Sequence, residues 1–73
     1  MQTNFKLHTM AKAMEDANIS VLDLAVAIGK HPSMVYQILR EERRPSLTTA
    51  LRIARVLNRS VEELFGEVTS LVS

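Results

Sequence analysis

Five side chains between positions 33 and 40 carry groups that can hydrogen-bond to, or pack against, the edges of nucleic-acid bases. They are Ser33, Met34, Tyr36, Gln37 and Arg40. If residues 32–40 form a helix, an apolar set falls together on the opposite face at i, i+3 and i+4. That apolar set is Val35, Ile38 and Leu39. Amide, hydroxyl and guanidinium groups read base pairs in the major groove, so this segment has the composition of a recognition helix.

Basic side chains surround this segment, although the whole chain has a formal net charge of only +1. Positions 30–59 hold seven lysines and arginines against two acids, a local balance of +5. Arg43 and Arg44 precede a helix that Ser46 or Thr48 can cap, and the first N–H groups of a helix bind phosphate well. The two arginines could clamp a phosphate backbone, or they could form a solubilising loop that the preceding glutamates neutralise. Lys30 has the same two interpretations.

A second short helical pattern precedes the first and is separated from it by a corner. Its apolar face carries Leu24, Ala25 and Ile28. Ser20 is placed as N-cap of a helix over residues 21–28, with Asp23 at the third helical position as in a capping box. Gly29 suits the left-handed residue that follows a helix, and Pro32 suits the first turn of the next one. Two short helices joined by such a corner form a helix-turn-helix motif.

Three further helices are expected around this pair, which predicts an all-α, five-helix domain over residues 1–66. The first helix begins after Thr3 or Asn4 and runs to about residue 17, where Asn18 can adopt a left-handed conformation. Its predicted core stripe is Leu7, Met10, Met14 and Ala17. Residues 41–45 should then form a charged surface loop that Pro45 ends. No segment shows the alternating pattern of a strand.

The last two helices complete the predicted domain. The fourth spans residues 47–57, ends at Asn58, and is expected to be the most fully buried. Its predicted apolar face consists of Leu47, Ala50, Leu51, Ile53, Ala54 and Leu57. Ser60 and Glu63 form a capping box that opens the fifth helix, and Gly66 is expected to stop it. Leu64 and Phe65 should face inward from this helix.

Composition excludes several classes of function. The chain has 73 residues and no cysteine, which leaves one small domain with neither a disulfide scaffold nor a zinc–thiolate site. His8 and His31 lack a carboxylate partner at i, i+4, so no metal site and no cofactor is expected. No catalytic set of nucleophile and base appears, which predicts a non-enzyme. Apolar runs too short for a bilayer and the lack of a leader pattern predict a soluble, cytoplasmic protein.

The stretch from Ile19 to Phe65 also follows the spacing of a known family. The matching residues are Ser20, Leu24, Ala25, Ile28, Gly29, Val35, Ile38, Pro45, Ser46, Leu51, Ile53, Ala54, Leu57, Ser60, Glu63, Leu64 and Phe65. With them the chain resembles the lambda-repressor/Cro-like helix-turn-helix domains, or XRE family. The resemblance implies five helices, with the third in the major groove of double-stranded DNA. It also implies a transcriptional regulator, usually a two-fold homodimer on a palindromic operator.

Two sets of DNA contacts are expected: the resemblance implies the base contacts, and side-chain chemistry suggests the backbone contacts. Base contacts fall on Pro32, Ser33, Met34 and Gln37. Backbone contacts are expected from Lys30, Tyr36, Arg40, Arg43, Arg44 and Ser46. Gln37 can pair with adenine, and Met34 can pack on a thymine methyl. Ser33 can donate a hydrogen bond to a base edge or accept one from it. The alternative is ordinary solvated surface for these side chains, and partial burial for Tyr36.

Departures from the family pattern favour a different class of function. The family often has Gln where Val21 stands, Ser or Thr where His31 stands, and Gly where Glu41 stands. Met14 stands where the family often has Arg, and Arg59 stands at a position that is usually apolar. Val21 and the low net charge suit a protein-interaction module of the antitoxin, immunity or anti-repressor kind, with weak or no DNA binding.

The C-terminal end, residues 67–73, is expected to be a tail that either dimerises or frays. Five apolar side chains in the fifth helix and the tail form the predicted dimer interface: Leu64, Phe65, Val68, Leu71 and Val72. One alternative is that Leu64 and Phe65 fold back as core while the tail frays. Another is that the tail docks on another domain of a longer protein. An isologous contact here would set two recognition helices one turn of DNA apart, about 34–36 Å.

Overall fold

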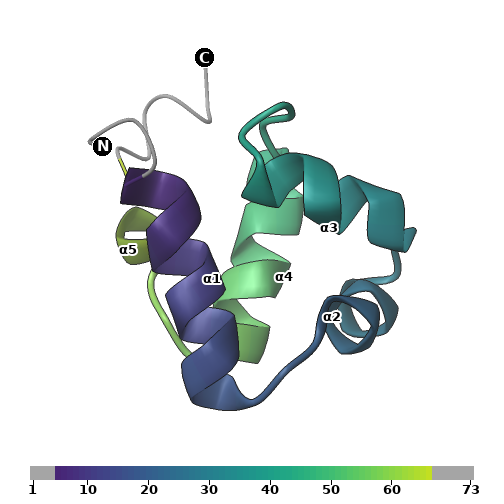
Figure 1. The fold of residues 1–73 in the computed structure, drawn as a ribbon. Coiled ribbons are helices and arrows are strands. Elements are labelled where there is room, and N and C mark those ends of the chain that lie inside the picture. The colour runs from purple at the N-terminus through teal and green to yellow at the C-terminus, as the bar shows by residue number, and fades with distance from the viewer. Residues whose placement is uncertain (1–4, 67–73) are drawn as a thin grey trace.

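Five helices make up the fold in the computed structural model, which describes residues 5–66 and the side chains from Thr9 onward. They are α1 (Phe5–Ala17), α2 (Val21–Ile28), α3 (Pro32–Leu39), α4 (Leu47–Leu57) and α5 (Val61–Phe65). Figure 1 shows α4 in the middle of the molecule, with α1 on one side and α2 and α3 on the other. The described residues contain no strand, and the predicted all-α class is confirmed.

The ends of α2 form as the sequence predicts. Ser20 Oγ accepts from the Asp23 N–H at 3.1 Å, and Asp23 Oδ2 accepts from the Ser20 N–H at 3.5 Å, which completes the capping box. Gly29 adopts the left-handed conformation with φ 72°, where a side chain would be strained. The Lys30 N–H then donates to the Ala25 carbonyl at 2.9 Å. These contacts turn the chain sharply into α3.

The other predicted caps are also present in the described residues. Asn18 and Asn58 end α1 and α4 in left-handed conformations, each with φ 58°. Ser46, rather than the alternative Thr48, is the N-cap of α4. Ser60 and Glu63 form the second capping box. The predicted N-caps of α1, Thr3 and Asn4, lie outside the described residues.

One apolar core joins all five helices. Its buried members are Met10, Ala13, Met14, Leu24, Ala25, Ile28, Val35, Ile38, Ala50, Ile53, Ala54, Leu57, Val61, Leu64 and Phe65. Met10 and Met14 confirm two of the four residues in the predicted stripe of α1. Ala17 is exposed, so its assignment to the core was wrong, because it lies in the last turn, where α1 ends. The side chain of Leu7 lies outside the described residues.

The prediction for α4 was partly wrong. Leu47 is 38% exposed and Leu51 is 51% exposed, whereas Thr49 is buried. The buried arc runs from Thr49 through Ile53 to Leu57, so Leu47 and Leu51 lie beyond one edge of it. Apolar spacing alone does not say how wide an arc the neighbouring helices cover. Pro45, predicted to end a surface loop, is buried as well.

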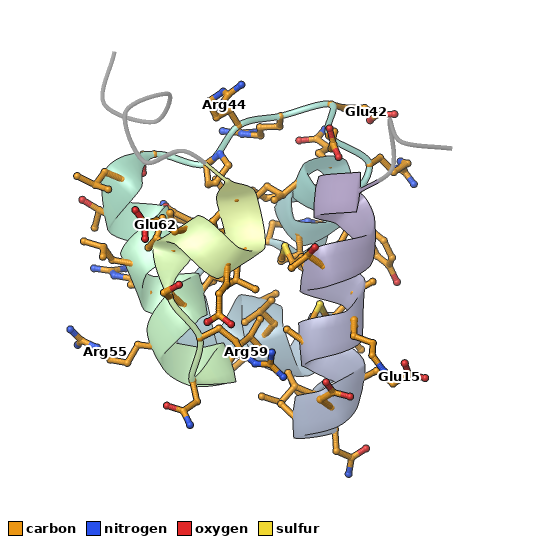
Figure 2. All side chains as sticks on the ribbon, turned by 90° about the vertical axis from the view of Figure 1, so that its left-hand side faces the viewer. Glu15, Glu42, Arg44, Arg55, Arg59 and Glu62 are labelled. Carbon is orange, nitrogen blue, oxygen red and sulfur yellow. The ribbon has the colours of Figure 1, made fainter. Side chains whose placement is uncertain are left out.

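Two arginines tie distant elements together. Arg52 Nη1 donates to the Ile28 carbonyl at 3.4 Å and so links α4 to the end of α2. Arg59 Nη2 donates to Asp16 Oδ2 at 3.1 Å, and Figure 2 shows Arg59 reaching from the turn before α5 toward α1. The first contact fixes the end of α2 against α4, and the second fixes α1 against the turn before α5. No helix in the described part of the chain is long and apolar enough to cross a membrane.

Candidate nucleic-acid interface

His31 is the N-cap of α3, a role that the sequence did not predict. Its Nδ1 accepts from the Ser33 N–H at 3.1 Å and lies 3.0 Å from Ser33 Oγ. Nδ1 must therefore be unprotonated in this arrangement. Pro32 follows at the first helical position, where its lack of an N–H is no loss. The imidazole thus replaces the hydroxyl of the family pattern, and the extended conformation that a residue before proline prefers was the available signal.

The two faces of α3 separate as predicted. Val35 and Ile38 are buried against the rest of the domain. Ser33 and Tyr36 are exposed, and Gln37 is half-buried. Pro32 and Met34 are also half-buried, and Met34 packs against the core. The outer face therefore offers a hydroxyl, a phenol and an amide, with part of the Met34 thioether beside them.

Gln37 contacts the loop that follows α3. Arg43 Nη1 donates to Gln37 Oε1 at 3.4 Å, so a predicted backbone-contacting residue lies beside a predicted base-contacting one. The loop folds back because Glu41 takes a left-handed conformation, φ 60°, and the Glu42 N–H donates to the Gln37 carbonyl at 2.9 Å. Both side chains were predicted to lie in the site, but their contact with each other was not predicted.

Tyr36 and Arg40 form a second pair on the outer face. The guanidinium of Arg40 lies over the Tyr36 ring, 6.0 Å from its centroid, a distance at which a cation–π interaction is worth about 0.5–1 kcal/mol on a surface. Arg40 Nε also lies 3.4 Å from Glu42 Oε2. Tyr36 is 48% exposed, so about half of its surface remains open on the outer face.

The beginning of α4 lies next to this loop. Ser46 Oγ accepts from the Thr49 N–H at 3.2 Å and donates to Thr49 Oγ1 at 3.1 Å. The hydroxyl of Ser46 is therefore used inside the chain, and the groups that remain for a phosphate are backbone N–H groups of the first turn. Arg43 and Arg44 are exposed before that turn, and Arg44 points away from the helices in Figure 2.

Basic side chains thus lie near both ends of α3. Lys30 is exposed in the corner before it, and Arg40, Arg43 and Arg44 are exposed after it. An eight-residue helix is about 12 Å long, which fits within the major groove with room for phosphate contacts at each end. The arrangement suits a duplex whose bases meet the middle of α3 and whose backbones meet its ends.

The residues proposed for a dimer interface divide into two groups. Leu64 and Phe65 are buried in the core of the single chain, which leaves them almost no surface for a second copy. Val68, Leu71 and Val72 lie outside the described residues. Within the described part of the chain, no group of three His, Cys, Asp or Glu side chains could hold a metal ion.

Comparison with known proteins adds an independent finding to this geometry. Residues 10–64 match the helix-turn-helix family model, a span that runs from α1 into α5. Neither the curated proteins nor the solved structures gave a match. The family match covers most of the chain and contains both helices of the motif and the loop after them. The chain belongs to the Cro/C1-type helix-turn-helix family, or XRE family, of DNA-binding transcription regulators.

Proposed function

We propose that this protein is a sequence-specific regulator that occupies an operator in double-stranded DNA and represses transcription there. The observation that carries the proposal is the outer face of α3. Ser33 and Gln37 face outward on it, and exposed basic side chains stand beyond both ends of the helix. In a family of DNA-binding regulators, this face supplies base-reading groups in the middle and phosphate-binding groups at the edges.

The proposed contacts follow from the chemistry of each side chain. Gln37 pairs with adenine by accepting from N6 and donating to N7. Its Oε1 has two lone pairs, so the contact with Arg43 leaves one for the base. The Ser33 hydroxyl donates to or accepts from a base edge, while Pro32 and Met34 pack on a thymine methyl. The proposed phosphate contacts are Lys30, Tyr36, Arg40, Arg43, Arg44 and the backbone N–H of Ser46.

We also propose that two copies bind a palindromic operator. A two-fold dimer would place two α3 helices about 34–36 Å apart, one turn of DNA. Leu64 and Phe65 are committed to the core, so the contact would depend on Val68, Leu71 and Val72 in the tail. Removing residues 67–73 should then weaken operator binding and make the chain monomeric by sedimentation equilibrium. A truncated chain with unchanged mass and unchanged affinity would refute the dimer.

Selection from a random duplex pool tests the proposed function. The expected result is a single enriched motif, bound by the intact chain with an affinity that falls steeply between about 50 mM and about 200 mM salt. A shuffled duplex of equal length is the control, and it should bind much more weakly. Failure to enrich any motif, or equal affinity for the shuffled duplex, would refute sequence-specific recognition.

A second candidate function rests on Val21. It is the first residue of α2 and packs against the core, at the position where the family often has a glutamine that reaches phosphate. With that contact missing, the same fold could act as a protein-interaction module of the antitoxin, immunity or anti-repressor kind. The salt titration separates the two candidates, because a protein-binding module would show no steep dependence of duplex binding on salt.

A further inference from the structure

The outer face of α2 is apolar, which is unusual for a surface helix. Seven of its eight residues are apolar, and Asp23 is the exception. Leu24, Ala25 and Ile28 are buried, but Leu22 is 64% exposed and Val26 is 81% exposed. Leu22 and Val26 stand at i and i+4, one above the other on the same side. A helix that is apolar all round is normally covered on all sides, so this side lacks a cover in the single chain.

A hollow of about 360 Å³ lies beside this face, between the C-terminal halves of α2 and α4. Its lining consists of Val26, Ala27, Ile28, Gly29, Arg52, Arg55 and Val56. Val26 and Val56 supply apolar side chains, and Arg52 and Arg55 supply the charge. No carboxylate lines it. Arg52 is held toward the Ile28 carbonyl at 3.4 Å, whereas Arg55 extends away from the helices (Figure 2).

We propose that this hollow, called here the α2–α4 hollow, docks an acidic amphipathic helix of a partner protein. Such a helix would place an apolar side chain against Val26 and Val56 and carboxylates against Arg52 and Arg55. Helix-in-groove recognition has this form, with apolar anchors one turn apart and charges at the rim. The inference goes beyond DNA binding, since none of these residues belongs to the proposed DNA contacts.

Charge decides which occupant fits. An isologous contact between two copies centred on this hollow would bring Arg52 and Arg55 close to the same arginines of the other copy, and like charges at such distances repel. A DNA backbone would match the arginines but would press phosphates against exposed Val26 and Leu22, which cannot hydrogen-bond to them. An acidic helix with an apolar stripe satisfies both the arginines and the valines.

A displayed random library of peptides about 16 residues long, selected on the intact chain, tests the proposal. The expected peptides combine apolar residues spaced three or four apart with flanking Asp or Glu. The most enriched peptide, synthesised and labelled, is then titrated by fluorescence anisotropy. Val26→Gln should weaken its binding about tenfold or more, and Arg55→Gln should weaken it less and reduce its salt dependence.

Leu51→Gln is the matched control. Like Val26, Leu51 is an exposed apolar residue, but it lies on α4 and does not line the hollow. Its replacement should therefore leave peptide affinity unchanged. Thermal unfolding of each variant shows that the fold is kept. The proposal is overturned if no peptide is enriched, if enriched peptides lack carboxylates, or if Leu51→Gln weakens binding as much as Val26→Gln. It is also overturned if sedimentation shows that wild type self-associates and that Val26→Gln abolishes this self-association.

Discussion

The two helices of the motif have the same length and similar inner faces, but their outer faces differ in chemistry. Helix α2 buries Leu24, Ala25 and Ile28, and α3 buries Val35 and Ile38. Outward, α2 presents leucine and valine, whereas α3 presents a hydroxyl, a phenol and an amide. The inner faces fix how the helices cross, so the outer faces are free to serve different partners. We therefore propose that the outer face of α3 binds DNA and that the outer face of α2 contributes to binding a protein.

The largest effect is expected where α2 faces the core. Ala25 is buried close to the corner that leads into α3, and Ala25→Leu forces extra methylene groups into that crossing. Overpacking of this kind costs about 1–3 kcal/mol, which lowers the Tm of a small domain by about 4–8 °C per kcal/mol. Thermal unfolding followed by circular dichroism measures it.

Val26→Gln on the opposite side of the same helix is the matched control. Val26 is mostly exposed, and an exposed helical substitution usually changes stability by less than about 0.5 kcal/mol. If Ala25→Leu and Val26→Gln both had the Tm of wild type, the proposed difference between the buried and exposed faces of α2 would be wrong.

A loss of base preference is expected on the outer face of α3. Gln37→Ala should cost about 1–3 kcal/mol on the selected duplex and relax the preference at one base pair. Anisotropy titrations on the selected duplex and its single-base variants measure both effects. A uniform loss of affinity on every duplex would mean that Gln37 does not read a base directly.

A smaller effect is expected from the loop arginines. Arg43→Gln and Arg44→Gln should each weaken binding to all duplexes alike and lower the magnitude of the salt slope by about one, as for a lost phosphate contact. Lys12→Gln, an exposed cation on α1, is the control and should leave the slope unchanged. Slopes that stay at the wild-type value in both arginine variants would leave these residues as plain surface charge.

The smallest effect is expected outside the helix pair, at the cap of α5. The Ser60 N–H donates to Glu63 Oε1 at 3.0 Å, and this bond, helped by the Ser60 side chain and the Arg59 charge, lowers the pKa of Glu63 below its ordinary value of 4.5. A lowered pKa stabilises the fold above the unfolded-state pKa, and that contribution is lost as the pH falls through the folded-state pKa.

Glu63→Gln keeps a cap acceptor but removes this titration. The stability of wild type relative to the variant should therefore shrink as the pH falls from about 6 to about 3. Urea unfolding across that range checks the prediction. A difference that is constant with pH would show that the Glu63 carboxylate makes no such contribution.

Local signals account for the parts of the fold that were predicted from the sequence. Ser20, Ser60, Gly29 and Asn58 act within one turn of their own position, so residue type and spacing suffice to place the caps. The inner faces of α2 and α3 follow from helical periodicity for the same reason. The ends of these helices in the structure therefore agree almost residue by residue with the ends predicted from the sequence.

Contacts between distant residues were the parts that could not be predicted. The bond from Arg52 to Ile28 joins residues 24 positions apart, and the pair of Arg59 with Asp16 joins residues 43 apart. No local pattern marks either one. In the candidate site the residue types were predicted, but the contact between Gln37 and Arg43 depends on the left-handed conformation of Glu41, where the family often has glycine. The exposure of Leu51 depends on where α4 meets its neighbours.

Chemical-shift mapping tests the assignment of DNA to the outer face of α3 most directly. The intact, isotope-labelled chain is titrated with the selected duplex, and backbone amide shifts are followed residue by residue. We expect the largest changes at residues 32–37 and 43–46, with little change at Leu22 and Val26. Large changes on the outer face of α2 with none at residues 32–37 would contradict it.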